Sequence, residues 1–145
     1  MKKGNTFILS KLLFNIMITN EDKELIQKAK ALVDAKDIRG GAVKEVGCVL
    51  ITEKGKLFSG VSLHLACGIG FCAEHTAISQ MITQTDETHI KTIVATNDEG
   101  AIPPCGRCRE LMNIIDTKNM DTEIIISDDK KVKLRELLPF AWEVE

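Results

Sequence analysis

The chain has 145 residues, a length typical of one domain, and its hydrophobic (44%) and charged (28%) fractions are those of an ordinary globular protein. Its 19 basic side chains are balanced by 21 acidic ones, and no run of five or more Lys or Arg occurs. Because proteins that bind DNA or RNA usually carry a basic stripe, this balance argues against a polynucleotide substrate.

The first stretch of the chain is apolar, with polar side chains at every fourth position. These polar positions are Lys11, Asn15 and Thr19. The pattern predicts a helix with one polar stripe, which packs on the domain or on another subunit. Two alternatives stay open: an upstream extension with translation starting at Met17, and a targeting segment, since the stretch begins with basic residues. We therefore expect an N-terminal extension at 1–19 and a domain at 20–145.

The remaining elements follow from hydrophobic periodicity and turn residues. Apolar residues at helical spacing after an N-cap at Asn20 predict a helix that ends before Gly40-Gly41. A Gly-containing turn at 53–56 joins two apolar runs and predicts a hairpin. After the first helix, the expected elements are strands 46–52 and 57–63, a helix 73–84, a strand 92–96, a loop 97–104, a helix 106–116, and strands 123–127 and 131–133.

This order of elements predicts an α/β fold. Strands that alternate with helices favour right-handed crossovers, which place helices over a sheet. The two strands of the first hairpin must be antiparallel, so the sheet is expected to be mixed. The fold class is therefore a three-layer α/β/α domain with a mixed sheet.

The cysteines of the chain point to a metal site. Their odd count does not suit a secreted disulfide framework and favours a cytoplasmic protein, where clustered cysteines more often bind metals or catalyse reactions. The five are Cys48, Cys67, Cys72, Cys105 and Cys108.

Three of these cysteines lie at predicted helix starts. Cys72 begins one helix, and Cys105 and Cys108 form a C-x-x-C at the start of another. The positive end of a helix dipole lowers the pKa of a thiol and favours the thiolate, which is the form that binds zinc. Three thiolates leave the fourth tetrahedral position for water, as in catalytic zinc sites. We predict one Zn²⁺ held by Cys72, Cys105 and Cys108.

Other interpretations of the cysteines stay open at this point. A C-x-x-C alone also fits a thiol redox pair, which would not need Cys72. Cys67 or His75 could complete a structural four-ligand zinc site. A non-catalytic zinc domain that binds a partner would keep the cysteines but would not need Glu74.

Glu74 is the candidate catalytic residue. It follows Cys72 by two positions, so it does not share that residue's helical face and need not bind the same ion. In the first turn it can point beside a metal-bound water, as the non-ligand Glu of zinc deaminases does when it acts as general acid and base. The alternative is a carboxylate that only stabilises the helix dipole.

These features together resemble the cytidine deaminase superfamily, in particular its free-nucleoside branch, which usually carries Cys rather than His in the first motif. The matching segments are 46–50, 55–60, Cys72-Ala73-Glu74, Pro104-Cys105-Gly106-Arg107-Cys108-Arg109-Glu110-Leu111 and Leu137-Leu138-Pro139, so the resemblance spans about residues 21–142. It implies a zinc-dependent hydrolytic deamination of cytidine, deoxycytidine or a related cytosine nucleoside, with release of ammonia. It also implies a homotetramer in cytoplasmic pyrimidine salvage, with no nucleic-acid or membrane partner.

The chain departs from that family in the segment that holds the sugar. The nucleoside enzymes usually have Asn-x-Glu after the second strand, where this chain has Ser62 and His64. By the resemblance, Ser62, His64 and Ala73 are the candidate substrate-binding residues. The missing carboxylate predicts weak cytidine turnover or a preference for a modified cytosine nucleoside. A blasticidin S-type aminohydrolase is the alternative, because that sister group varies the same segment and shares the 135–139 type of ending.

Three further positions near the site carry expectations. His75 stands where many nucleoside enzymes have an Arg, and is expected to bond a thiolate or to face solvent. Arg109 is a second candidate for a bond to a thiolate. Phe140 and Trp142 are expected to pack on the edge of the core or to approach the active site of a neighbouring subunit.

Overall fold

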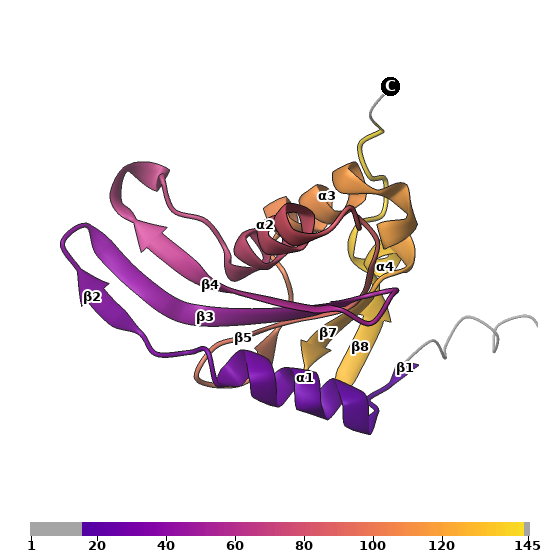
Figure 1. Ribbon diagram of the computed structural model, residues 1–145, viewed down its shortest axis with the longest axis horizontal. Helices are drawn as coiled ribbons and strands as arrows, with labels where there is room; N and C mark the ends of the chain where they lie inside the picture. Colours follow the sequence, from indigo (N-terminus) through magenta and orange to yellow (C-terminus); the bar gives the residue numbers. More distant parts are fainter. Residues whose placement is uncertain (1–15, 144–145) are drawn as a thin grey trace, which may run out of the picture.

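The computed structural model describes residues 16–143. These residues form three layers, of which the middle one is a mixed sheet (Figure 1). The eight strands are β1 (Ile16–Met17), β2 (Lys36–Ile38), β3 (Gly41–Thr52), β4 (Leu57–Leu65), β5 (Ile90–Thr96), β6 (Ala101–Ile102), β7 (Glu123–Ser127) and β8 (Lys130–Lys133). The helices are α1 (Asn20–Lys30), α2 (Ala73–Gln84), α3 (Gly106–Ile115) and α4 (Leu134–Leu137), with 3₁₀ segments η2 (Ala66–Gly68) and η3 (Thr117–Asp121). The predicted α/β/α layers are confirmed, since α1 covers one face and α2 and α3 cover the other.

Strand β3 organises the sheet. It pairs antiparallel with β4 along one side and with β5 and the short β2 along the other. Strands β5 and β7 are parallel, whereas β8 is antiparallel to both β7 and β1. The sheet is therefore mixed, as the sequence predicted.

The alternation of side chains along β3 divides the core between the two faces. Cys48 and Leu50 are buried against α2, α3 and the strands beneath them. Val49 and Ile51 are buried on the opposite face, in the smaller cluster that includes Leu25 of α1. Because successive residues of a strand point to opposite faces, one apolar run contributes side chains to the core on both faces of the sheet.

The structure corrects the prediction for the start of the domain. The N-cap of α1 is Thr19 rather than Asn20: its hydroxyl accepts from the N–H of Asp22 at 3.2 Å, and the Asp22 carboxylate accepts from the Thr19 N–H at 2.7 Å. The predicted helix over the first nineteen residues is wrong at Ile16–Met17, which form β1 and pair with β8. The rest of that helix, at 1–15, lies outside the described residues.

Besides β1 and the two 3₁₀ segments, three short elements were not predicted. Strand β2 lies between α1 and Gly40-Gly41, β6 lies in the expected loop 97–104, and α4 lies in the expected tail. Each has two to four residues, which is too short for hydrophobic periodicity to register. Within 16–143, no helix has the length and hydrophobicity needed to cross a membrane.

Close contact between β4 and α2 sets the position of the helix that begins after Cys72. A Cβ added to Gly60 would lie 2.5 Å from the backbone nitrogen of Ala77 and 2.5 Å from the Cβ of Thr76. The nitrogen of Ala77 is a backbone atom, and the Cβ of Thr76 is bonded directly to the backbone. Rotation of a side chain therefore cannot relieve the clash. Gly60 thus allows α2 to approach the sheet closely enough to hold Cys72 in place.

We expect Gly60→Ala to lower the stability of the fold by about 1–3 kcal/mol, as overpacking usually does. The displaced α2 should also weaken zinc binding, because Cys72 is the residue that caps it. Gly40→Ala is the matched control, since its Cβ would meet nothing within 4 Å. Thermal unfolding and zinc content measure both effects, and equal melting temperatures for the two variants would contradict the close-contact argument.

Candidate active site

The N-termini of two helices meet over the sheet and bring three cysteines together. Cys72 is the N-cap of α2 and Cys105 is the N-cap of α3, both with extended backbone. Cys108 lies in the first turn of α3 and is fully buried. The N-terminal ends of both helices, with their unpaired N–H groups, therefore lie next to the sulfur atoms, where they favour negative charge.

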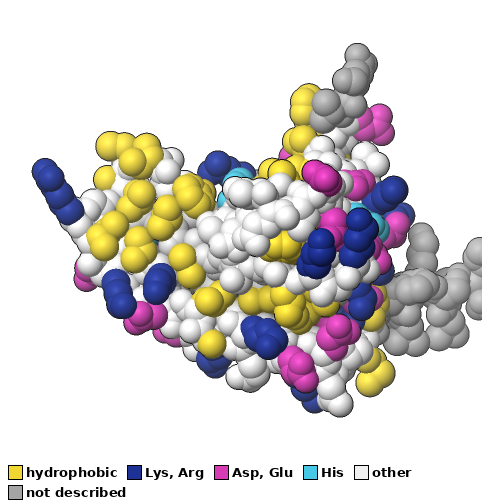
Figure 2. Space-filling model, in the orientation of Figure 1, with side chains coloured by type: hydrophobic (Ala, Val, Ile, Leu, Met, Phe, Trp, Pro, Cys, Tyr) yellow, Lys and Arg dark blue, Asp and Glu magenta, His cyan; other side chains and the backbone are white. Residues whose placement is uncertain are grey.

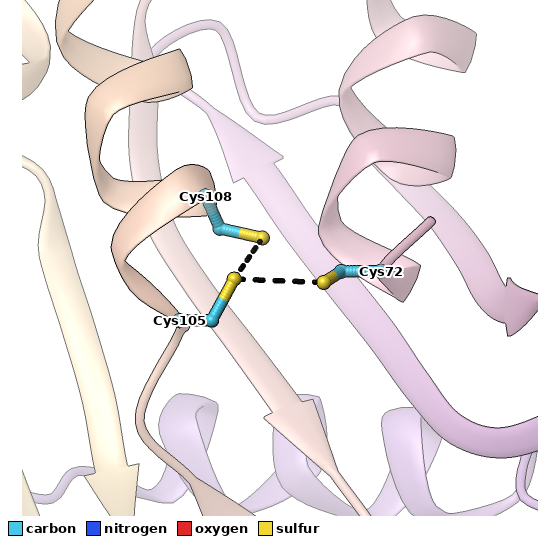
Figure 3. Close-up of side chains that lie close together, drawn as sticks. All are labelled: Cys72, Cys105 and Cys108. Atoms are coloured by element: carbon cyan, nitrogen blue, oxygen red, sulfur yellow. Dashed lines mark hydrogen bonds between the residues drawn. The ribbon is translucent and has the colours of Figure 1, made fainter. Parts of the chain in front are cut away.

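The sulfur atoms are close enough to share one ion (Figure 3). The Sγ of Cys105 lies 3.5 Å from that of Cys72 and 3.4 Å from that of Cys108. All three sulfurs lie within 4.8 Å of one another. Zinc–thiolate bonds of about 2.3 Å at tetrahedral angles separate sulfur atoms by about 3.8 Å. The donor set and its spacing therefore fit one zinc ion with a fourth position free.

The thiols differ in how readily they ionise. Burial raises the pKa of Cys108 well above its ordinary value, and the nearby Glu74 carboxylate adds to the rise. Burial also opposes ionisation of Cys105, but the backbone N–H of Cys108 and the two neighbouring thiols outweigh it and lower the pKa of Cys105. A cation bound among these sulfurs would compensate the charge that burial disfavours.

Glu74 lies beside this cluster. Its side chain is 5% exposed, and it lines the same cavity as Cys72 and Cys105. Burial raises the pKa of Glu74 above the ordinary value of a glutamate, and the Cys108 thiol opposes part of that rise. A carboxyl group whose pKa moves toward neutrality is suited to accept and return a proton.

The cavity above the cysteines has a volume of about 610 Å³, within the range of small-molecule sites. All three residues predicted to bind substrate line it: Ser62, His64 and Ala73. The hydroxyl of Ser62 accepts from the backbone N–H of Val46 at 3.0 Å. Nδ1 of His64 lies 3.2 Å from Oε2 of Glu45, and the His64 side chain is 82% exposed.

Other residues singled out from the sequence lie apart from the sulfur atoms. Cys67 is exposed on η2, outside the cysteine cluster. Nε2 of His75 is buried without a hydrogen-bond partner among the described residues, and its ring lines a different cavity from that of the cysteines. Arg109 does not serve a thiolate, since it donates to the carbonyls of Pro104 at 2.8 Å and Leu137 at 3.1 Å.

The C-terminal aromatic residues do not pack into the core. Phe140 is fully exposed and Trp142 is 64% exposed, so the expectation that they cover its edge is wrong. The backbone carbonyl of Trp142 accepts from the Asn113 amide at 3.2 Å, which places this segment beside α3 with its rings facing outward.

Sequence analysis missed two charged residues of the cavity. Glu45 and Arg107 both line it. Arg107 stands inside the C-x-x-C, where its closeness to the cavity could have been expected. Glu45 carried no signal, because regular alternation along β3 would turn it to the opposite face of the sheet.

Comparison with known proteins identifies the family to which this site belongs. A sequence model described as the cytidine and deoxycytidylate deaminase zinc-binding region matches residues 19–123. The chain belongs to this family. A cytidine deaminase of Sporosarcina psychrophila is 26% identical over 103 residues, which are 69% of this chain and 76% of that protein.

Solved structures of the family share the fold. The crystal structure of cytidine deaminase from Burkholderia pseudomallei has a TM-score of 0.67 at 27% identity and covers 86% of this chain and 100% of that chain. The enzyme from Mycobacterium leprae has a TM-score of 0.66 at 24% identity, with coverage of 84% and 99%. The predicted cytidine deaminase-like fold is confirmed. Family and cysteine cluster together make this chain a zinc-dependent hydrolytic deaminase with one zinc ion.

Proposed function

We propose that this deaminase acts on a cytosine nucleoside through Glu74 and a zinc ion held by Cys72, Cys105 and Cys108. The observation that carries the proposal is the position of the Glu74 carboxyl group, buried beside three clustered thiols at one end of a cavity. Neither a redox pair nor a structural zinc site needs a buried carboxylate at that position.

The residues of the chain divide the chemistry between them. Zinc, when bound, supplies a hydroxide nucleophile at neutral pH by lowering the pKa of water. Glu74 would take one proton from the attacking water and pass it to ring N3 of the cytosine. Once the hydroxyl has added to C4, Glu74 would take the proton of that C4 hydroxyl and pass it to the amino group, which leaves as ammonia while the C4 carbonyl forms. Water is consumed and the uracil compound is formed, so atoms and charge balance.

The cavity wall orients the base. Ala73 is the first residue of α2, so its backbone N–H has no acceptor within the helix and is available to a base carbonyl. Ala73 also lies between Cys72 and Glu74 in the chain, which supports this role for its N–H. We propose Ser62 and His64 as contacts to the rest of the substrate.

A deamination assay tests the function. We expect the zinc-loaded protein to release ammonia from cytidine or deoxycytidine with a kcat/KM at least tenfold above that for free cytosine, because the cavity extends beyond the base. Blasticidin S is the fourth compound, since Ser62 and His64 replace the usual sugar-binding pair. Release of ammonia from blasticidin S alone would redirect the function to that aminohydrolase. Absence of release from all four would contradict deamination of cytosine compounds.

We further propose a homotetramer that acts in cytoplasmic pyrimidine salvage. Hydrophobic side chains gather at the left of Figure 2, over the ends of β2, β3 and β4 in Figure 1. Ile69 and Phe71 are exposed in this part of the chain, and Phe71 lines the cavity. An apolar surface next to an active site is typical of an interface between subunits. The division into an extension at 1–19 and a domain at 20–145 stays a prediction.

A further inference from the structure

A second carboxylate lines the active-site cavity, on a strand where the family resemblance does not place one. Of the residues in 16–143 that line this cavity, Glu45 and Glu74 carry carboxylates. Glu74 is 5% exposed and lies beside the cysteine cluster. Glu45 lies beside His64, which stands at the position where nucleoside enzymes usually have the Glu of Asn-x-Glu.

An irregularity in β3 is what brings Glu45 to the cavity. The register with β4 shifts between Val43 and Gly47, and Lys44 has a φ of 61°. Left-handed backbone at a residue other than Gly is uncommon and marks a local bulge. The N–H of Asp34 donates to the Lys44 carbonyl at 3.0 Å, which holds the irregular segment in place.

Without that bulge, Glu45 would face the other layer. A Cβ on Gly47 would meet Ala29, in α1, so a residue two positions earlier on a regular strand would point toward that same face. Instead Glu45 lines the cavity together with Val46, whose side chain packs on the α2 side. Three residues of β3, at 44–46, thus lie opposite the single residue Ser62 of β4, and this irregular segment re-aims Glu45, as bulges near active sites do.

Two contacts connect this segment to β4. The N–H of Val46 donates to the Ser62 hydroxyl at 3.0 Å, which ties the bulge to β4. Nδ1 of His64 lies 3.2 Å from one carboxylate oxygen of Glu45, and the other oxygen has no hydrogen-bond partner among the described residues. Glu45 is 44% exposed, so that free oxygen can reach a molecule in the cavity.

We propose that Glu45 is a substrate-binding residue that accepts hydrogen bonds from the sugar hydroxyls of the nucleoside, and that His64 is a positioning residue for its carboxylate. This inference rests on the proposed function. A nucleoside carries its base at one end and hydroxyl donors at the other. The cavity carries its proton carrier at a buried position, where Glu74 is 5% exposed, and an acceptor without bound hydrogen at a more open one, where Glu45 is 44% exposed. The carboxylate that β4 lacks is thus supplied by β3.

Glu45→Gln tests the proposal in the zinc-loaded protein. Gln keeps the length of the side chain but loses the charge and one acceptor oxygen. We expect KM for cytidine to rise by about 10- to 100-fold, the change that a lost hydrogen bond to a charged acceptor produces, while kcat stays within about threefold. Turnover of free cytosine, which has no sugar, should not change.

Glu53→Gln is the matched control. Glu53 is about as exposed as Glu45 and also faces a histidine, with 3.7 Å between its Oε1 and Nε2 of His89, but it lies outside the cavity. The KM of the Glu53→Gln protein for cytidine should equal that of the unchanged protein. Adding His64→Glu to Glu45→Gln returns a carboxylate to this end of the cavity from β4, and should restore most of the affinity.

Calorimetric titration with cytidine supplies a readout that does not need turnover. In a Glu74→Gln background, the dissociation constant should rise by the same factor when Glu45→Gln is added. Unchanged KM and affinity in a protein that deaminates cytidine would overturn the role of Glu45 and leave the function intact. A parent protein that neither binds nor deaminates cytidine would overturn both. An equal loss of cytosine turnover would show that Glu45 supports the fold of the site rather than the sugar.

Discussion

Cys105→Ala is expected to leave the protein without zinc and to lower its melting temperature by roughly 10 °C. The Sγ of Cys105 is the middle atom of the cluster, within 3.5 Å of both other sulfurs. Its removal leaves two ligands, one of which is the fully buried Cys108. Metal affinity falls steeply when a ligand is lost, because the remaining thiolates must be ordered and desolvated for a weaker bond.

The size of the effect follows from linkage. A ligand present at a thousand times its dissociation constant stabilises the folded state by about 4 kcal/mol. For a chain of this length each kcal/mol corresponds to about 2–4 °C in the melting temperature. Metal analysis after gel filtration gives the zinc content, and calorimetry with and without a chelator gives the stability.

Cys67→Ala is the control for the loss of a thiol. Cys67 is exposed and lies outside the cluster, so its replacement should keep one zinc per chain and the same melting temperature. Retention of a full zinc complement by Cys105→Ala would show that the three-cysteine assignment is wrong. Zinc loss in Cys67→Ala would instead favour a four-ligand structural site.

The cysteine cluster could be predicted because its signals are local. Cys72 and Cys105 were each expected at the start of a helix, and the structure places each at the N-cap of α2 or α3. The helix predicted from Ala73 to about Gln84 is present as α2, because its apolar periodicity extends from end to end. Both helices lie on one face of a sheet that contains parallel strands. Their N-termini therefore come together at the same end of those strands.

The place of Glu45 in the cavity wall could not be predicted, because it depends on a departure from regular strand geometry. The sequence indicates a missing carboxylate at His64. It does not indicate that a bulge at Lys44 turns Glu45 into the cavity, since the φ of a Lys in a strand has no sequence signature. Exposure of Phe140 and Trp142 was also missed, because burial of aromatic residues is a tendency that the local chain direction overrides.

Glu74→Gln is expected to abolish deamination while zinc and fold remain. Gln has the same length and still forms hydrogen bonds, but it cannot carry a proton. General acid–base catalysis by one group is worth about 10²–10⁴-fold in rate. Since Glu74 would serve water, ring N3 and the leaving amine in turn, kcat should fall by about 10⁴-fold or more. Removing a buried carboxylate whose pKa burial raises should not destabilise the domain.

Glu21→Gln separates catalysis from an effect on the helix dipole. Glu21 lies in the first turn of α1 as Glu74 lies in the first turn of α2, so both variants lose the same interaction with the dipole, about 0.3–1 kcal/mol. Only Glu74 faces the cysteines. Steady-state kinetics at equal zinc content should show normal turnover for Glu21→Gln and almost none for Glu74→Gln, whereas cytidine binding should persist in both. Near-normal deamination by zinc-loaded Glu74→Gln would mean that another group moves the proton, and the buried carboxyl beside the cysteines would then be a structural feature of α2.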